Sequence, residues 1–589
     1  METIVGIDLG TTNSEIAIIQ DGKPVVLEEN GSCMLPSVIG LDSSGQMLIG
    51  QPARNQAAAL PDRTIKSIKR KMGRDITVEL GDQSFTPQEV SAIILRSLKQ
   101  RAETAIDGPV SKAVITVPAY FDDNQRQATK AAGELAGLEV VRIINEPTAA
   151  ALTYSPNSTE QETLLVYDLG GGTFDVSIVR VERGVVEVLA SHGDTQLGGD
   201  DVDRAILDHV CDTFKKKKRV DLRHDRVSRA RVLNAVETAK KELSSEVSVK
   251  IQEEFIAERK GVAQHLDMVL ERSGVDELVF PLLEKTLHCV DRALEDANLT
   301  ADEIDKVVLV GGATRMPLVR DLLEGRLQKD VHTEVEPDLC VAMGAAIQAG
   351  LINGMDLGAV LVDVTPHTLG VDTVRSDRMG NILQTDVFVP MIRRNTPLPA
   401  TFTKEFSTVH AGQEGVIVPI LQGESPCSLD NSKIGEIELE GMRDGDDVNR
   451  FFTRFDLDLN GMLKVVLTER GTGNTEDIVI QSALRKFASD HMEDAKGRLN
   501  EVLPENLRDD EDDASTDDDI PQELREIVTK GREVIANAER LAEASGEEDL
   551  ADLGELVARF EQAIEDKAED ALKEVVAEIE ELLFYLDDQ

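Results

Sequence analysis

A degenerate internal repeat constrains the fold of this chain more than any other feature. The run Ile4-Val-Gly-Ile-Asp-Leu-Gly-Thr-Thr-Asn13 recurs 160 residues later as Leu164-Leu-Val-Tyr-Asp-Leu-Gly-Gly-Gly-Thr-Phe-Asp175. Each copy is an apolar strand ending in Asp, then a Gly/Thr turn, then a second apolar strand. Glycine lets backbone N–H groups approach phosphate oxygens, and threonine hydroxyls add donors. The repeat predicts a phosphate clamp between two similar halves, with a hydrated Mg²⁺ bridging the aspartates to phosphate.

A third turn predicts where a nucleotide base lies. Val307-Val-Leu-Val-Gly-Gly-Ala-Thr-Arg315 follows another apolar strand and precedes a helical pattern. Paired glycines let a flat base lie on the backbone, and Arg315 is placed to stack over it. Taken alone, this motif is equally typical of a close-packed strand-to-helix turn. The sequence G-x-x-x-x-G-K-[ST] is absent, which argues against a P-loop ATPase.

Hydrophobic periodicity divides the chain into segments of different class. Up to about residue 355, apolar runs alternate with helical patterns, which is typical of an α/β domain. Between residues 364 and about 483, short alternating strands with Asn460-Gly461 as a hairpin turn predict an antiparallel β domain. A short, mostly apolar connector that could dock on a neighbouring surface joins the two, and from Leu484 onward the pattern is helical.

Charge and cysteine spacing exclude several classes of function. The chain has 63 Lys+Arg against 110 Asp+Glu, a net charge of −47. Such a surface repels polyanions, so neither nucleic acid nor an anionic membrane is expected as a partner. No apolar run approaches the roughly 18 residues of a membrane span, and the first residues do not resemble a secretory signal. The five cysteines form no C-x-x-C, as expected for reduced thiols in a cytoplasmic protein.

Much of the negative charge lies in the helical C-terminal part. In residues 509–519, eight of eleven side chains are acidic, which predicts a disordered segment. A later apolar stripe at 3-4 spacing predicts a helix that packs on the preceding one, which starts near the capping box Ser545-Gly-Glu-Glu548. The stripe consists of Leu572, Val575, Val576, Ile579, Leu582, Leu583 and Leu586.

In combination, these motifs resemble the heat-shock 70 kDa chaperones of the bacterial DnaK type. The likeness runs from residue 1 to about 483. It is also carried by Ser67-Ile-Lys-Arg70, Val117-Pro-Ala-Tyr-Phe121, Arg142-Ile-Ile-Asn-Glu-Pro-Thr-Ala-Ala150, Leu197-Gly-Gly199, Asp363-Val-Thr-Pro366 and Leu421-Gln-Gly423. The resemblance implies a multidomain chain, whose parts are an actin-like α/β (ribonuclease H-like) ATPase domain at 1–355, a linker at 356–363, a β-sandwich peptide-binding domain at 364–483 and an α-helical lid or tail at 484–589.

The resemblance also implies a nucleotide site, residue by residue. Its ligands would be ATP or ADP with Mg²⁺, and K⁺ is a further candidate cation. Asp8 and Asp168 would hold the metal through water. The implied catalytic residues are Asp8, Lys69, Glu146, Asp168, Thr173 and Asp175. The implied nucleotide contacts are Gly10, Thr11, Thr12, Asn13, Gly170, Gly171, Gly172, Gly198, Gly199, Glu237, Lys240, Lys241, Ser244, Gly311, Gly312, Arg315 and Asp338.

Without the resemblance, some of these residues have plainer interpretations. Lys69 lies in a basic stretch and would be a surface lysine. Glu237, Lys240, Lys241 and Ser244 share one helical face, which would equally suit a solvated, salt-bridged helix. The implied peptide cleft consists of Val371, Thr373, Val374, Phe406, Val409, Gln413, Val416 and Val418. Any single valine of that set could instead belong to the core of the sandwich.

The resemblance further implies coupling between the two domains and a set of partners. Positions matched to interdomain coupling and J-domain contact are Pro118, Arg126, Arg142, Asn145 and Asp363. The partners would be unfolded or extended polypeptides, a J-domain co-chaperone and a GrpE-like nucleotide exchange factor. The expected activity is slow, partner-stimulated ATP hydrolysis that controls peptide binding and release in protein folding and the stress response.

Alternatives and departures remain open from the sequence. An actin-like filament former or scaffold, and a sugar kinase sharing the ATPase fold, are the competing functions. Val374 and Val409 stand where bacterial relatives usually carry Met and Ala, so the peptide preference should differ. The stretch from Arg74 to Phe85 is short, and the less bulky connector suggests weaker coupling. After about residue 508 no familiar lid sequence follows.

Overall fold

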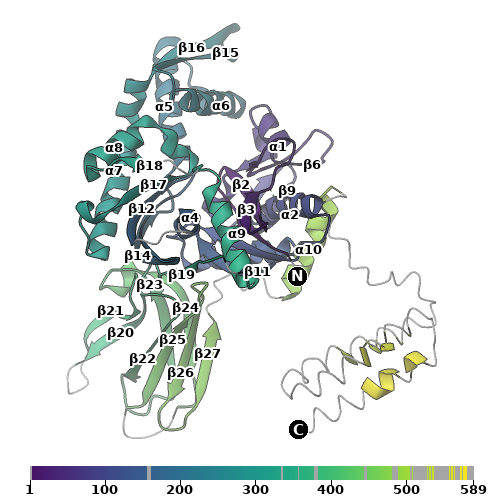
Figure 1. The fold of residues 1–589 in the computed structure, drawn as a ribbon, viewed down its shortest axis with the longest axis vertical. Helices are drawn as coiled ribbons and strands as arrows, with labels where there is room; N and C mark the ends of the chain where they lie inside the picture. Colours follow the sequence, from purple (N-terminus) through teal and green to yellow (C-terminus); the bar gives the residue numbers. More distant parts are fainter. Residues whose placement is uncertain are drawn as a thin grey trace. The chain divides into compact units, whose positions relative to one another are not determined.

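The chain forms two compact units, residues 1–507 and 508–589 (Figure 1). The structure is a computed structural model that describes residues 3–154, 161–332, 336–355, 357–376, 382–442, 448–479 and 489–504, together with Leu507 and individual positions between 527 and 579. Over these described residues, none of the helices combines the length and the apolar character that crossing a membrane requires.

The first sheet is built from the strands around the first phosphate turn. β1 (Ile4–Asp8) lies parallel to β10 (Lys112–Val117) and antiparallel to β2 (Asn13–Gln20). The strand order is β11-β10-β1-β2-β3, with β4 beside β2. The outer strands are β3 (Lys23–Val26), β4 (Leu35–Pro36) and β11 (Glu139–Asn145). We call this sheet, with the helices on it, lobe I.

The second sheet, which belongs to lobe II, repeats the arrangement around the second phosphate turn. β12 (Glu162–Leu169) lies antiparallel to β13 (Phe174–Glu182) and parallel to β17 (Lys306–Val310). The strand order is β18-β17-β12-β13-β14-β19. The remaining strands are β14 (Val185–Asp194), β18 (Val331–His332) and β19 (Val360–Val362).

The registers show that the sequence repeat is also a structural repeat. Asp8 lies opposite Glu15 in lobe I, and Asp168 lies opposite Asp175 in lobe II. In both lobes, an acidic residue at or near the end of the strand before the turn therefore pairs with a second acidic residue near the start of the strand after it. Because the two turns occupy equivalent places, they can face each other across the space between the lobes.

Two helices lie between the two sheets and join them. α4 (Glu146–Tyr154) and α9 (Cys340–Ile352) pack on strand residues of both lobes through one apolar cluster. They approach so closely that a Cβ at Gly344 would overlap the backbone of Ala149. On the outer face of lobe I lie α2 (Pro87–Ile106), which begins at a capping box of Thr86 and Glu89, and α3 (Asp123–Leu135).

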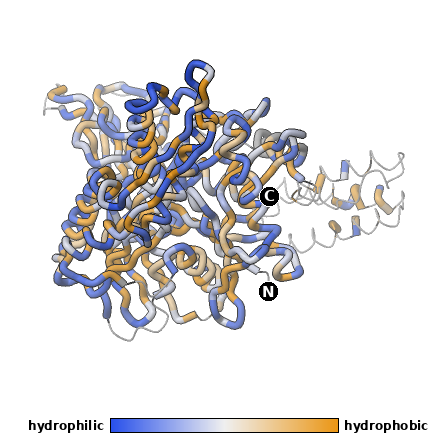
Figure 2. The backbone as a smooth tube through the Cα atoms, turned by 90° about the horizontal axis from the view of Figure 1, so that it is seen from above, coloured by the Kyte–Doolittle hydropathy of each residue, from blue (hydrophilic) through white to orange (hydrophobic). Residues whose placement is uncertain are grey.

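The other elements complete the two lobes. In Figure 2 hydrophobic residues run through the interior of the large unit, while many peripheral loops are hydrophilic. Lobe II carries α5 (Gly199–Lys218), α6 (Arg226–Glu242), α7 (Arg272–Ala297), α8 (Pro317–Leu327) and the hairpin of β15 (Ser248–Arg259) and β16 (Val262–Glu271). Lobe I carries α1 (Gln51–Gln56), β5 (Val38–Leu41), β6 (Met47–Ile49), β7 (Thr64–Lys66) and the 3₁₀ turn η2 (Ile68–Lys71). The short stretch after Arg74 forms a small hairpin of β8 (Val78–Leu80) and β9 (Gln83–Phe85).

The antiparallel segment is a sandwich of two four-stranded sheets. Their orders are β21-β20-β23-β24 and β22-β25-β26-β27. The strands are β20 (Leu369–Ser376), β21 (Ile382–Ile392), β22 (Ala400–Ser407), β23 (Val416–Gln422), β24 (Ser432–Leu439), β25 (Arg450–Leu457), β26 (Leu463–Glu469) and β27 (Thr475–Val479). Alternate residues of β25 and β26 are buried, as the period-2 pattern predicts for strands with one face on a core.

The connector is docked rather than free. Val360, Leu361 and Val362 form β19, which pairs in parallel with β14 at the edge of the lobe II sheet. A Cβ at Gly184 would overlap the carbonyl of Gly358, so this approach requires glycine. The apolar connector therefore forms backbone hydrogen bonds with the lobe II sheet, and its position depends on that sheet.

After the sandwich, a helix returns to lobe I. α10 (Ser489–Val502) packs Ala495 and Leu499 into the apolar cluster that α2 and α3 share with the sheet, and Leu503 and Leu507 extend the contact. Arg498 pairs with Glu89 of α2. The helical segment that the sequence predicts as a lid thus begins by packing on lobe I.

The C-terminal unit has a small core of its own. Leu572, Val575, Val576 and Ile579 of the predicted stripe are buried with Phe560. Ala563 joins the same cluster, and Ile527 and Val534 pack against it, so the stripe does pack on preceding helical segments. The predicted acidic segment 509–519, the capping box at 545–548 and the last three leucines of the stripe lie outside the described residues.

Candidate nucleotide-binding site

A single large cavity lies between the two lobes and brings together most of the predicted nucleotide residues. Its volume is about 990 Å³, in the upper range of small-molecule sites. The predicted residues that line it are Asp8, Gly10, Thr11, Thr12, Asn13, Lys69, Glu146, Asp168, Gly170, Gly171, Thr173, Gly199, Glu237, Lys240, Lys241, Ser244, Gly311, Gly312, Arg315 and Asp338. Three others, Gly172, Gly198 and Asp175, stand directly behind this lining.

The phosphate turns are held by hydrogen bonds and meet each other. In lobe I, the Gly10 N–H donates to Ser14 Oγ (3.1 Å), and the Ser37 hydroxyl donates to the Gly10 carbonyl (2.8 Å). In lobe II, the Gly170 N–H donates to the Thr173 carbonyl (3.1 Å). A Cβ at Gly171 would overlap the Thr12 hydroxyl of the opposite turn. The glycines therefore bring two sets of backbone donors to one place, which is the arrangement that binds a polyphosphate.

Behind the second turn, two further glycines serve packing. A Cβ at Gly198 would lie 2.6 Å from the backbone of Gly171, and one at Gly172 would lie 2.7 Å from Thr11. The Gly199 N–H at the start of α5 donates to the Gly170 carbonyl (3.0 Å). These residues support the phosphate turn from behind, so their effect on a ligand is indirect, except for Gly199, which lines the cavity.

Lys69 is buried in the cavity wall rather than exposed on the surface. It lies on η2, whose preceding residue Ser67 has a left-handed φ of 54°, and is 4% exposed. Its ammonium pairs with Glu146 at the first turn of α4. Burial disfavours the charged lysine, but Glu146 and Asp8 outweigh burial and raise its pKa above the usual value. The site therefore presents one desolvated, permanently positive group to a bound phosphate.

Carboxylates face this lysine from both lobes. Burial raises the pKa of Asp8, whose Oδ1 accepts a hydrogen bond from the buried Thr116 hydroxyl (2.8 Å). Burial, with Glu146 and Asp175 nearby, raises the pKa of Asp168 well above its usual range. Paired carboxylates of this kind prefer a hard cation between them. Within the described part of the chain, no three His, Cys, Asp or Glu side chains form a ready-made metal cage, so water and phosphate would have to supply the remaining ligands.

Asp175 is fixed by the backbone of lobe I. The Tyr120 N–H donates to Asp175 Oδ1 (3.0 Å), and the Ala119 amide adds a second hydrogen bond. Burial, with Glu146 nearby, raises the pKa of Asp175 to about 8 despite these donors. The carboxylate is thus oriented by the Ala119-Tyr120 turn, a segment of the other lobe.

On the opposite side of the cavity, the third turn and α6 form the predicted base-binding side. Lys240 pairs with Asp203 (2.8 Å), and its Nζ donates to the Gly199 carbonyl (3.2 Å). Glu237 pairs with Lys241 and, across the cavity, with Arg54 of α1. A cross-cavity ion pair ties the two lobes together at the mouth of the site.

Arg315 does not lie free to stack on a base in this structure. Its guanidinium is paired with Asp338 (2.7 Å) and Glu336 (3.0 Å), which raises its pKa. These two ion pairs hold the Arg315 guanidinium against the segment that leads into α9. Asp338, the predicted nucleotide contact with the most divergent neighbours, therefore has a defined partner.

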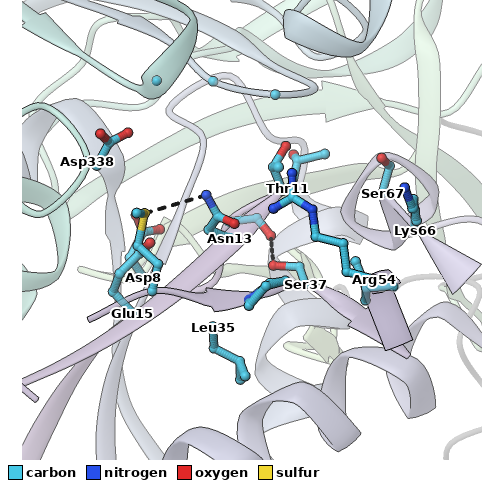
Figure 3. A pocket seen from close by; sticks show the side chains of 18 of the residues that line it. Asp8, Thr11, Asn13, Glu15, Leu35, Ser37, Arg54, Lys66, Ser67 and Asp338 are labelled. Carbon is cyan, nitrogen blue, oxygen red and sulfur yellow. Dashed lines mark hydrogen bonds between the residues drawn. The ribbon is translucent and has the colours of Figure 1, made fainter. Parts of the chain in front are cut away.

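The most informative residue that sequence reasoning missed is Glu15. It lines the cavity, is 3% exposed, and lies opposite Asp8 in the sheet. Figure 3 shows Asp8, Glu15 and Asp338 on one side of the pocket, with Arg54, Lys66 and Ser67 on the other. Burial raises the pKa of Glu15 well above its usual value, and Asp8 and Asp338 raise it further. The sequence signal was a single charged residue in an otherwise apolar strand.

We predict that breaking the cross-cavity ion pair speeds nucleotide release. In Arg54→Gln, Glu237 keeps Lys241 but loses its contact with lobe I. The pair is partly exposed, so the expected cost is about 0.5–1 kcal/mol, or roughly a two- to fivefold faster release. Stopped-flow displacement of a fluorescent ADP analogue measures it. The control is Lys130→Gln, which breaks a pair within α3 alone; an unchanged release rate in Arg54→Gln would exclude the clamp.

The predicted peptide-cleft residues are distributed between core and surface. Val371 (1% exposed) and Val418 (7%) are buried in the sandwich core, and Phe406 and Val416 pack against it. Val374 is 37% exposed. The Thr373 hydroxyl donates to the Val387 carbonyl (3.3 Å), and the Val409 N–H donates to Gln413 Oε1 (3.2 Å). The cleft remains a prediction, with Val374 as its most accessible member.

The predicted coupling residues meet at the junction of lobe I and the sandwich. Arg126 donates to Asn145 Oδ1 (2.6 Å), and Asn145 Nδ2 donates to Asp363 Oδ2 (2.9 Å). Pro118 begins the turn that follows β10, with its carbonyl accepting from the Phe121 N–H (3.1 Å). Arg142 is half-buried on β11. Burial lowers the pKa of its guanidinium, and the nearby Asp363 carboxylate opposes this shift. A buried polar network thus connects the end of the connector to lobe I.

These observations define a class of protein before any comparison. Two matched sheets clamp a cavity lined by phosphate-binding turns, and a strand-forming connector joins them to a β-sandwich, as in a two-lobed, actin-like ATPase with an attached binding domain. The sequence model of the family described as Hsp70 protein matches residues 4–80 and 74–586. The chain belongs to the Hsp70 family. Members of this family are ATP-dependent chaperones that hydrolyse ATP, use Mg²⁺ and act with co-chaperones on unfolded proteins.

Proposed function

We propose that this chain is a DnaK-type, ATP-dependent chaperone of the cytoplasm, in which slow hydrolysis of ATP controls the binding and release of extended apolar peptide segments. The observation that carries the proposal is the buried network of Arg126, Asn145 and Asp363. It connects the connector of the β-sandwich to the lobe whose turns line the nucleotide cavity. A conformational change of the lobes would therefore alter how the sandwich is held.

In this proposal the residues of the cavity share the work of phosphoryl transfer to water. The two Gly/Thr turns bind the phosphates, and the Lys69 ammonium neutralises the charge that develops on the transferred group. Asp8 and Asp168 would hold a hydrated Mg²⁺, which supplies charge neutralisation to the phosphates. Glu146 and Asp175 would orient the attacking water, because both are buried and oriented by lobe I.

On the peptide side, the cleft would bind an extended backbone without reading a strict sequence. The β-branched Val374 and Val409 would make its arch stiffer than a methionine arch. A J-domain co-chaperone would act at the surface around Arg142 and Asn145, and a GrpE-like factor would promote exchange. The connector pairs with three residues of β14. The strength of the coupling between the ATPase domain and the sandwich sets how far ATP shifts the affinity for peptide.

The expected result is that ATP weakens peptide binding at least tenfold relative to ADP. Fluorescence anisotropy of a labelled, extended, leucine-rich peptide measures this with the full chain. A J-domain protein should accelerate hydrolysis several-fold in single-turnover assays. Equal peptide affinity with ATP and ADP would exclude the chaperone cycle, whereas sedimentation of polymer with ATP would support a filament former instead.

A further inference from the structure

Two histidines and a tyrosine from three separate parts of the chain meet at one junction. Tyr120 lies in the turn after β10 of lobe I, His192 on β14 of lobe II, and His367 in the sandwich just before β20. The Tyr120 ring stacks on His192, with centroids 5.1 Å apart at 25°, and meets His367 edge-on at 4.4 Å and 61°. The contact between Tyr120 and His367 exists only while the β-sandwich is docked on the ATPase domain, whereas the Tyr120–His192 stack lies within that domain.

Tyr120 is also the residue that orients a carboxylate of the nucleotide site. Its N–H donates to Asp175 Oδ1 (3.0 Å), and its carbonyl accepts a hydrogen bond from His367 Nε2 (3.1 Å). Because a carbonyl only accepts, His367 carries its proton on Nε2. The backbone of Tyr120 is therefore held by His367 of the sandwich, and the same residue in turn holds the Asp175 carboxylate.

The surroundings of both rings disfavour an imidazolium. Burial lowers the pKa of His367 to about 4, and the Arg126, His192 and Arg394 charges act in the same direction, with the hydrogen bond to Tyr120 opposing them. Burial lowers the pKa of His192 to about 4 as well. Around His192, Arg292 and Arg394 oppose the positive charge and Asp296 favours it. The buried Nδ1 of His192 has no hydrogen-bond partner among the described residues.

We propose that His367 is a positioning residue through which the docked sandwich holds Tyr120, and with it Asp175, and that protonation of His367 and His192 releases this hold. The sandwich then leaves the junction, because two cations beside Arg126 and Arg394 cannot stay buried there. This regulation goes beyond the proposed chaperone cycle. The pH then becomes a second control, besides the bound nucleotide, of the contact between the sandwich and the ATPase domain.

The sign of the effect follows from the pKa values in the two states. Once the sandwich leaves, each histidine returns towards 6.5, so the undocked state binds more protons between pH 6.5 and about 4. The histidine contribution to docking is therefore complete above pH 6.5 and is lost as the pH falls. Between pH 7.5 and 5.5, each histidine would lower the docked-to-undocked ratio by about tenfold with the full pKa shift, and by about sixfold with half of that shift.

Acidic groups at the same interface titrate with the opposite sign, since burial also raises the pKa of Asp363. Asp123 of α3 faces a small cavity that it shares with Val364 and Gln422 of the sandwich, and neither of its carboxylate oxygens has a hydrogen-bond partner among the described residues. Burial raises its pKa to about 8. Docking therefore takes up a proton at Asp123, so the histidine effect has to be read as a difference between wild type and variant.

The test measures cleavage of the connector in the full chain with ATP bound. A protease that cuts before leucine and valine reaches residues 357–363 only after β19 leaves the sheet. Cleavage rates are taken between pH 7.5 and 5.5 and normalised to an unfolded reference chain at each pH. In His367→Leu, an uncharged side chain of similar size fills the site, so the acid-induced increase in cleavage should fall by about sixfold to tenfold relative to wild type.

Companion variants separate the hydrogen bond from the titration. His367→Gln keeps a donor for the Tyr120 carbonyl but cannot gain a proton, so its pH dependence should be weakened to the same extent as that of His367→Leu. His192→Asn should weaken the pH dependence independently, because the other histidine still titrates in each single variant. His209→Asn, an exposed histidine on α5, is the matched control and should behave as wild type. A wild-type pH profile in both His367→Leu and His192→Asn overturns the proposal.

Discussion

Lys69→Met should abolish ATP hydrolysis while leaving ATP binding intact. The ammonium is a buried cation close to both Asp8 and Asp168, and methionine keeps its length without its charge. Removing a preorganised positive group that stabilises developing phosphate charge costs about 10²- to 10³-fold in rate. The backbone donors of the two turns remain, so the dissociation constant for ATP should change by only a few-fold.

Single-turnover release of phosphate and calorimetric titration with ATP measure these two quantities separately. The matched control is Lys71→Met, two residues along the same 3₁₀ turn and exposed. Glu146 loses its partner in Lys69→Met, so thermal unfolding of the variant should be checked beside the kinetics. Hydrolysis within threefold of wild type in a folded Lys69→Met would remove this lysine from the mechanism.

The phosphate turns could be predicted because they are local. Each needs only a strand, a glycine turn and a hydroxyl, and all three are adjacent in sequence. The same repeat contained a further signal that was not used. Glu15 follows Asp8 by the same seven positions that separate Asp175 from Asp168, and the structure places both pairs opposite each other in their sheets. Aligning the halves residue by residue would have predicted Glu15 as a cavity residue.

The junction around Tyr120 could not be predicted in the same way. Its three rings come from residues 120, 192 and 367, and nothing in the local sequence of any one of them requires the other two. The same holds for α10, since amphipathic spacing shows that Leu499 needs a partner surface but not that this surface is α2. Contacts of high sequence separation depend on the complete fold.

Burial also decides which predicted residues act directly. Alternation along a strand gives two faces but does not say which one a peptide would reach. Val371 and Val418 are in the sandwich core, whereas Val374 is exposed enough to meet a ligand. Arg315 matches a family position for the base, yet its pairing with Asp338 was not visible from the motif.

Asp363→Ala should uncouple the two domains. Asp363 accepts from Asn145 Nδ2 and from the Val364 N–H (2.8 Å), and it is the first counter-charge of the buried Arg126. Its loss leaves Arg126, 6% exposed, facing the interface without its principal neutralising charge. Breaking one side of such a buried network costs about 3–5 kcal/mol, which corresponds to a loss of the docked state of roughly 10²- to 5 × 10³-fold.

Two measurements should change together in that variant. The protease should cut the connector as fast with ATP as it cuts a fully undocked chain, and ATP should no longer weaken the affinity for a labelled peptide. Basal peptide affinity with ADP should stay within about twofold, because the sandwich core lies away from Asp363. Asp477→Ala, which breaks a surface pair with Lys464 in the same sandwich, controls for loss of charge. If Asp363→Ala keeps both a protected connector and a full ATP effect, the buried network carries no coupling, and the signal between the domains must run through other contacts, such as the β14–β19 pairing and the Tyr120–His367 junction.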